Sequence, residues 1–201
     1  MTLYFNGLKA QVRALPNSTS QAPPTRAELF SAAGKTVPDV VAPDLRVLFC
    51  GINPGLYSGA VGHHFARPGN RFWRVLHLAG FTDSALTANE ERKLLDYGFG
   101  ITNLVARATA KASEISAEEL RAGARRLEQK VKRLKPRHVA ILGIEAYRRA
   151  FLRPEATVGR QNEKLGDAAL WLLPNPSGLN AHYPRVADLR EIFRPLAAAA
   201  C

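Results

Sequence analysis

The chain has 201 residues, of which 46% are hydrophobic, and this is enough for one well-buried domain. It contains no run of 18 or more apolar residues and no secretory signal pattern, so we expect a cytoplasmic protein without a membrane span. Lys and Arg number 28 against 17 acidic residues, and the formal net charge of +11 favours nucleic acid as a partner. Two cysteines are too few for a disulfide framework or a four-thiolate centre, and we expect no metal and no cofactor.

Residues 1–44 differ in composition from the rest of the chain. Pro, Ser and Thr are concentrated in "LPNSTSQAPPTR" and "GKTVPDVVAPD", with room for one short helix around residues 26–33. We interpret residues 1–44 as an N-terminal extension that is flexible or lies along a domain formed by residues 45–201.

From residue 45 onward, apolar runs alternate with amphipathic stretches. The apolar runs predict strands at residues 45–51, 100–105, 138–143 and 170–176. The amphipathic stretches predict helices at residues 72–79, 87–98, 116–135, 144–151 and 185–197. This alternation predicts an α/β fold of three layers, α/β/α, with a mostly parallel central sheet of about four strands.

Two unusual loops follow the first and the fourth of these strands. "GINPG" (51–55) and "NPSGLN" (175–180) both combine Asn, Pro and Gly. Because ligands of such sheets bind beyond the carboxyl ends of the strands, we expect the two loops to meet in one crevice. The long, poorly periodic stretch that follows "GINPG" contains His63, His64 and Phe65, and a loop of this length is more often functional than structural.

Several common site types are excluded by their motifs. The sequence has no G-x-x-x-x-G-K-[ST] phosphate loop, and the spacing of its glycines does not match the dinucleotide fingerprint. The H-x-E and C-x-x-C pair of the base deaminases is also missing. His63 and His64 are adjacent, so their side chains diverge and a shared metal ion is not expected.

The motifs "GINPG", "F-A-x-P-x-N-R-F-W", "GITNLV" and "LPNPSGL" resemble, in order and spacing, those of the mismatch-specific uracil-DNA glycosylases. These enzymes belong with the thymine-DNA glycosylases in the uracil-DNA glycosylase superfamily, and the resemblance runs from about Arg46 to Phe193. It implies a monofunctional enzyme that acts on double-stranded DNA with a G·U or G·T mismatch. Such an enzyme flips out uracil, or a related damaged pyrimidine, and hydrolyses its N-glycosidic bond to leave an abasic site. A monomer is the simplest form for an enzyme that encloses one nucleotide.

The resemblance implies roles for residues of the first loop. Asn53 would hold the attacking water, Ile52 would offer backbone groups to the extruded base, and Phe65 would stack on that base. Ser58 matches a position near the C5 edge of the base. Tyr57, beside it, departs from the small residues that are common there.

The resemblance also implies roles in the second loop. Asn175 would help to hold the water or the base, and Leu179 would be the wedge that fills the vacated stack. Gly178 and Asn180 would present backbone groups to the orphaned guanine. General uracil-DNA glycosylases carry Asp and His-Pro-Ser where this chain has Asn53 and Asn175. Enzymes with an iron–sulfur cluster need four cysteines.

An amide cannot take up a proton near neutral pH, so Asn53 can orient a water but cannot act as a strong general base. We therefore keep Asp96, close to a predicted strand, as a second candidate catalytic residue. We expect Arg67, Arg71 and Arg185, which flank the motifs, to contact DNA phosphates. Two other interpretations stay open: a general uracil-DNA glycosylase without mismatch preference, and a non-catalytic DNA-binding module that retains the fold.

Overall fold

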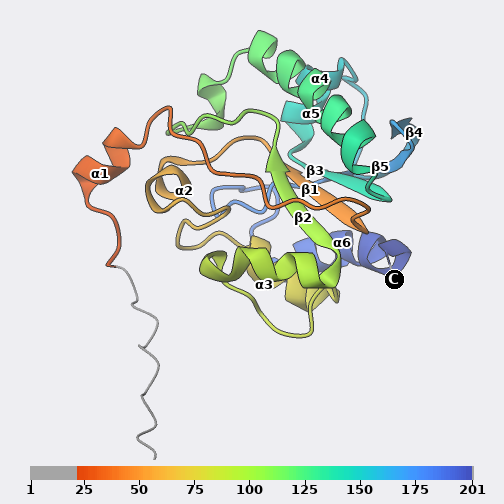
Figure 1. Cartoon of the computed structure of the whole chain (residues 1–201), viewed down its shortest axis with the longest axis horizontal. Helices are drawn as coiled ribbons and strands as arrows, with labels where there is room; N and C mark the ends of the chain where they lie inside the picture. Colours follow the sequence, from red (N-terminus) through yellow and green to blue (C-terminus); the bar gives the residue numbers. More distant parts are fainter. Residues whose placement is uncertain (1–21, 201) are drawn as a thin grey trace, which may run out of the picture.

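The computed structural model describes residues 22–200. They form three layers, with a central sheet between two layers of helices (Figure 1). The sheet has the order β2-β1-β3-β5-β4 and contains β1 (Val47–Gly51), β2 (Phe99–Asn103), β3 (His138–Leu142), β4 (Gly159–Leu165) and β5 (Ala168–Leu173). β4 runs antiparallel to β5, and the other strands are parallel. The predicted α/β class and mostly parallel sheet are confirmed, with five strands in place of about four.

The helices follow the predicted pattern closely. They are α1 (Arg26–Ser31), α2 (Leu56–Val61), α3 (Phe72–Ala79), η1 (Ala88–Tyr97), η2 (Ala112–Glu114), α4 (Ala117–Leu134), α5 (Ile144–Phe151) and α6 (Val186–Ala200). Gly80 and Gly98 end α3 and η1 with φ of 91° and 75°, in the left-handed region that glycine favours. Two details differ from prediction: η1 is a 3₁₀ helix, and α2 occupies part of the stretch expected to be a loop.

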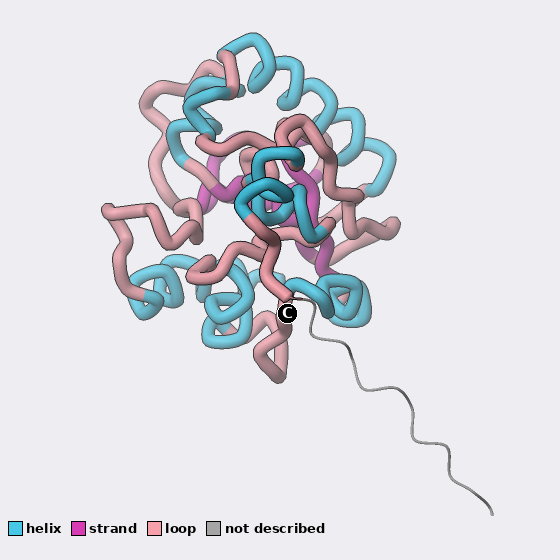
Figure 2. Tube along the Cα trace, turned by 90° about the vertical axis from the view of Figure 1, so that its left-hand side faces the viewer, coloured by secondary structure: helices cyan, strands magenta, loops and turns pink. Residues whose placement is uncertain are grey.

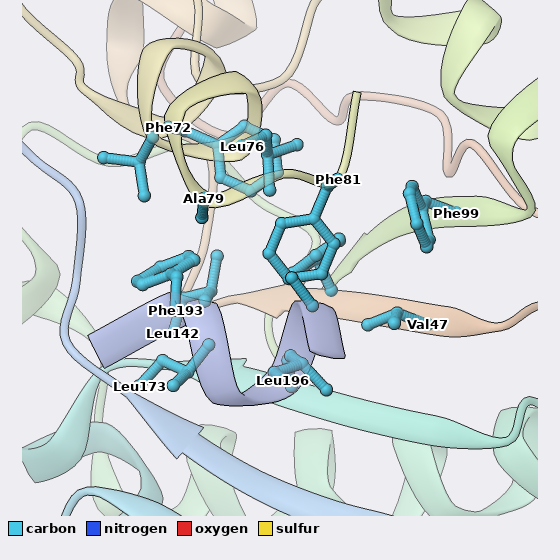
Figure 3. Packing of buried hydrophobic residues seen from close by; sticks show 14 of the residues in the cluster. Val47, Phe72, Leu76, Ala79, Phe81, Phe99, Leu142, Leu173, Phe193 and Leu196 are labelled. Carbon is cyan, nitrogen blue, oxygen red and sulfur yellow. The ribbon is translucent and has the colours of Figure 1, made fainter. Parts of the chain in front are cut away.

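The helices bury both faces of the sheet. One face packs against α4 and α5, and the other packs against α3 and α6; in Figure 2 the strands lie in the middle with helices above and below. Figure 3 shows the second face, where side chains of α3 and α6 pack over Val47, Leu142 and Leu173 of the strands. A parallel sheet covered on both sides explains why its strands read as continuous apolar runs in the sequence.

The described part of the N-terminal extension packs along the domain. Val40 and Ile101 exchange two backbone hydrogen bonds, of 2.9 and 2.7 Å. Asp39 accepts a hydrogen bond of 2.8 Å from the buried Thr102 hydroxyl and forms an ion pair with Lys130. Residues 22–44 therefore lie along the domain, while the rest of the predicted extension, residues 1–21, falls outside the described residues.

The strand order creates a topological switch point. The chain runs from β1 to β2 on one side and then crosses to β3 on the other side of β1. The connections that leave the carboxyl ends of β1 and β3 therefore diverge and open a crevice between them. None of the helices in residues 22–200 combines the length and the apolar composition that a membrane span requires.

Candidate active site

A cavity of about 670 Å³ lies at the carboxyl ends of the parallel strands. It is lined by residues at or just after the ends of β1, β2, β3 and β5, which include Asn53, Asn103, Gly143 and Asn175. Ligand-binding pockets commonly have volumes of about 300–1,000 Å³, so one flipped pyrimidine can enter a cavity of this size.

The cavity is built largely from two segments that are far apart in the sequence. We call residues 51–71 the first segment and residues 174–183 the second segment. They touch backbone to backbone: the Arg71 N–H donates to the Pro176 carbonyl at 3.0 Å, and a Cβ added to Gly178 would lie 2.6 Å from the Gly69 carbonyl oxygen. The structure thus brings together the two asparagine-containing loops singled out in the sequence.

The side-chain amide of Asn53 is fixed by its surroundings. Its Nδ2 lies 2.9 Å from the Pro54 carbonyl oxygen, 3.2 Å from that of Arg107 and 2.8 Å from the Thr109 hydroxyl. All three atoms can accept a hydrogen bond, so the end of the amide that faces them is the NH2 group. Oδ1 is then the amide atom that can bind a cavity water. Thr109 is buried and donates its own hydrogen to the Lys111 carbonyl at 2.9 Å. Our sequence reasoning missed Thr109.

Phe65 lies in the first segment with its ring supported from within the core. Its centroid is 4.0 Å from that of the fully buried Phe72, and the two rings are stacked with an interplanar angle of 25°. Gly51 leaves room beside it, because a Cβ there would lie 3.3 Å from Phe65 Cζ and 2.4 Å from Asn103 Oδ1. The Phe65 ring is therefore held in one place on the cavity wall.

The two adjacent histidines are joined by one buried carboxylate. Glu91 of η1 contacts His63 Nδ1 at 2.9 Å and accepts a hydrogen bond of 2.7 Å from the His64 backbone N–H. His64 Nε2 lies 2.9 Å from the Pro38 carbonyl, which can only accept, so Nε2 carries the hydrogen and Nδ1 can accept from Asn103 Nδ2 at 3.3 Å. Burial lowers the pKa of the His64 imidazole below 6.5, which favours this neutral form. His64, held by Glu91 and Pro38, therefore orients Asn103 in the cavity.

Ser58 and Ile52 also line the cavity. The buried Ser58 hydroxyl accepts a hydrogen bond of 3.2 Å from the Ala66 N–H and so ties α2 to the loop that carries Phe65. Ile52 packs on Gly143, where an added Cβ would lie only 2.8 Å from the Ile52 side chain. Tyr57 is not among the lining residues, so the structure does not place its side chain in the cavity.

In the second segment, local hydrogen bonds shape a compact turn. Asn175 Oδ1 accepts from the Ser177 N–H at 3.0 Å, and Asn180 Nδ2 donates to the Asn175 carbonyl at 2.9 Å. Leu179 lies between them at the cavity and is 72% exposed. Its large apolar side chain is thus presented to solvent, and its role as a wedge stays a prediction.

Two predicted roles are corrected by the structure. Arg71 is only 8% exposed and donates from its guanidinium to the carbonyls of Pro176, Ser177 and Tyr183, so the expected phosphate contact is wrong. Asp96 is exposed on η1, at the amino end of β2, whereas the cavity lies at the carboxyl end of that strand. The strand is about 17 Å long at about 3.3 Å per residue, so Asp96 lies far from the cavity and the structure does not support it as the second candidate catalytic residue.

The cavity rim is cationic and carries little negative charge. Arg67 and Lys111 line it with exposed side chains, while Glu145, its one acidic residue within the described chain, is paired with Arg148 at 2.7 Å. Arg185 is exposed but is paired with Asp188 at 2.7 Å, and its predicted phosphate contact stays a prediction. In residues 22–200, no cluster of three or more His, Cys, Asp and Glu side chains could hold a metal ion.

Two comparisons with known proteins agree with this geometry. The fold is similar to the solution structure of a candidate uracil DNA glycosylase from Methanosarcina acetivorans, with a TM-score of 0.54 and 20% sequence identity over 81% of this chain and 98% of that one. A family model described as "Uracil DNA glycosylase superfamily" matches residues 38–197, a range that contains both cavity segments and every strand. The chain therefore belongs to the uracil DNA glycosylase superfamily.

Proposed function

We propose that this protein is a monofunctional DNA glycosylase that removes uracil from G·U mismatches in double-stranded DNA, with thymine in G·T and damaged pyrimidines as further candidate substrates. The observation that carries this proposal is the fixed amide of Asn53, whose Nδ2 is occupied and whose Oδ1 is left to bind water, on the wall of a cavity that also presents an aromatic ring and an exposed leucine. Membership of the superfamily supports the same chemistry.

Recognition would begin with extrusion of the base. Leu179 would fill the gap left in the stack, while the ring of Phe65, backed by Phe72, would receive the flipped pyrimidine. Arg67 and Lys111 on the rim would contact the flanking phosphates in place of Arg71. A wobble pair is easier to open than a matched pair, so a G·U preference can arise from the energy of extrusion.

Hydrolysis would proceed without a strong protein base. Asn53 Oδ1 would accept a hydrogen bond from a water and place its oxygen near C1′ of the deoxyribose. As the C1′–N1 bond breaks, its electron pair leaves with the pyrimidine, the water oxygen bonds to C1′, and the water gives up one proton to solvent or to the departing anion. The Nδ2 group of Asn103 and nearby backbone N–H groups would stabilise that anion. The ion-paired state of Glu145 fits a mechanism that does not use a carboxylate base.

The proposed enzyme leaves an intact abasic site. A strand-cleaving lyase needs a lysine that loses its proton readily, and burial favours this loss. Lys111 lies on the cavity rim but is exposed, so it lacks the buried setting that such a lysine needs and is placed to contact phosphate. Borohydride should therefore trap no covalent adduct between the protein and abasic DNA.

One assay compares this proposal with its two alternatives. Duplexes that contain G·U, A·U or G·T, and a single strand that contains uracil, are incubated with the protein and then treated with alkali. We expect cleavage at G·U to be much faster than at A·U. Equal rates on the two would identify a general uracil-DNA glycosylase. No product from any substrate, together with retained duplex binding, would identify a non-catalytic DNA-binding module.

A further inference from the structure

Arg71 occupies an unusual position for a cation in a DNA-binding protein. Its guanidinium is buried between the two cavity segments, and Nε donates to the Pro176 carbonyl at 3.2 Å. The two terminal nitrogens donate to the carbonyls of Ser177 and Tyr183. Within residues 22–200, no carboxylate lies within 4.0 Å of it. The rigid fork of an arginine is thus used to gather three backbone carbonyls from both ends of one turn.

The second segment has little other polar support. Its remaining hydrogen bonds are internal and join residues two to five positions apart, such as Asn180 Nδ2 to the Asn175 carbonyl and the Leu179 N–H to Ser177 Oγ. Among the described residues, Arg71 alone supplies hydrogen bonds from outside the segment. The position of Leu179 therefore depends on Arg71, through its backbone N–H to Pro176 and above all through the three carbonyls that its side chain gathers.

Arg71 also stands next to the support of the stacking ring. It is the residue before α3, and the first residue of that helix, Phe72, packs against Phe65. One short stretch of chain thus contacts both the support of the aromatic wall and the segment that carries the exposed leucine. A change in Arg71 would shift these two groups relative to each other.

We propose that Arg71 is a positioning residue that sets the wedge, Leu179, at the height required for base extrusion. This inference rests on the proposed glycosylase function, and Arg71 acts in it without touching DNA. Lysine cannot replace it, because three donors at one point cannot reach carbonyls spread from residue 176 to residue 183.

The test is a double-mutant cycle measured by single-turnover cleavage of a G·U duplex at saturating enzyme. The variants are Arg71→Met, Leu179→Ala and the double variant, with Arg71→Lys as the conservative change. Arg74→Met is the matched control, because it removes the same charge from an exposed side chain three residues further along α3. Melting temperatures are measured for every variant.

We expect Arg71→Met to lower the rate by about 10- to 100-fold, Arg71→Lys to restore little of it, and Arg74→Met to stay within about 3-fold of the wild type. When Leu179→Ala is already present, adding Arg71→Met should lower the cleavage rate by less than about 3-fold, because the wedge that Arg71 positions is already gone. Equal effects of Arg71→Met and Arg74→Met would overturn the inference. The inference would also be overturned if Arg71→Met lowered the cleavage rate of the Leu179→Ala variant as strongly as it lowers that of the wild type.

Two further measurements keep the inference testable if Arg71→Met folds poorly or the wild type has no activity. Gly178→Ala should separate the segments with Arg71 intact, since the new Cβ would meet the Gly69 carbonyl, and it should lower the rate in the same way. Limited proteolysis needs no activity: Arg71→Met should speed cleavage within residues 174–183, and Arg74→Met should not. A wild-type protein without product on any uracil substrate would defeat the proposed function, whereas unchanged proteolysis would defeat the positioning role.

Discussion

Removal of the Thr109 hydroxyl tests how the amide of Asn53 is oriented. Thr109→Val keeps the shape of the side chain but deletes the acceptor 2.8 Å from Asn53 Nδ2 and the bond to the Lys111 carbonyl. The amide retains two acceptors, the carbonyls of Pro54 and Arg107, so both hydrogens of Nδ2 stay bonded while the amide plane turns. We therefore expect a partial loss of water positioning, about 10-fold in rate, or about 1.4 kcal/mol.

Thr82→Val provides the matched control. Thr82 is also buried and also donates to the carbonyl of the residue two positions later, at 2.8 Å, but it lies outside the cavity lining. Each variant should lose about 1 kcal/mol of stability for each hydrogen bond removed. The assay is single-turnover cleavage of a G·U duplex, with melting temperatures recorded in parallel. Equal rates for the two variants would refute orientation by Thr109, and a loss above about 1,000-fold would show that its hydroxyl takes part in the chemistry itself.

Three further predictions concern the cavity wall and the wedge. Burial lowers the pKa of the His64 imidazole and is also the largest cause of the lowered pKa of His138. The unfolded chain therefore binds more protons than the folded chain as the pH falls through 6.5, and this lowers stability. We expect the melting temperature to fall between about pH 7 and pH 5, and His64→Asn to reduce this fall without removing it. A pH-independent melting temperature between 7 and 5 would contradict this. Gly51→Ala should lower both the stability and the rate of excision, since its Cβ would lie 2.4 Å from Asn103 Oδ1. A melting temperature and an excision rate equal to those of the wild type would show that Asn103 moves aside without cost. Leu179→Ala should leave the melting temperature unchanged, because the side chain is exposed, and should lower excision from duplex DNA by about 10-fold or more; an unchanged rate would exclude the wedge.

Much of the fold could be predicted because its signals are local. The strands at 45–51, 138–143 and 170–176 are buried on both faces and so appear as apolar runs, while Ser116 and Glu119 mark the start of α4 by a capping box. β4 gives no such signal: residues 159–165 form an edge strand that is largely exposed, and their polar side chains have no apolar periodicity.

The site was only partly predictable, since it depends on contacts between distant residues. Asn53 and Asn175 stand out because each follows an apolar run. Thr109 has no distinguishing neighbours and reaches Asn53 only because β2 pairs with β1, so that Asn103 lies opposite Gly51. Arg71 could not be separated from a phosphate-binding arginine by sequence, because its burial results from the fold of the second segment.

The rate of uracil release by Asn53→Ala shows whether this amide places the attacking water. Under single-turnover conditions on a G·U duplex, we expect a loss of at least about 100-fold with duplex affinity close to that of the wild type, because the variant loses the atom that places the water. The melting temperature should fall as well, because the hydrogen bonds from Nδ2 to Pro54, Arg107 and Thr109 are lost, so the rate is measured well below the melting temperature of the variant. Excision at the wild-type rate by Asn53→Ala would show that a group other than this amide directs the water, and the proposed role of Asn53 in the cavity would be wrong.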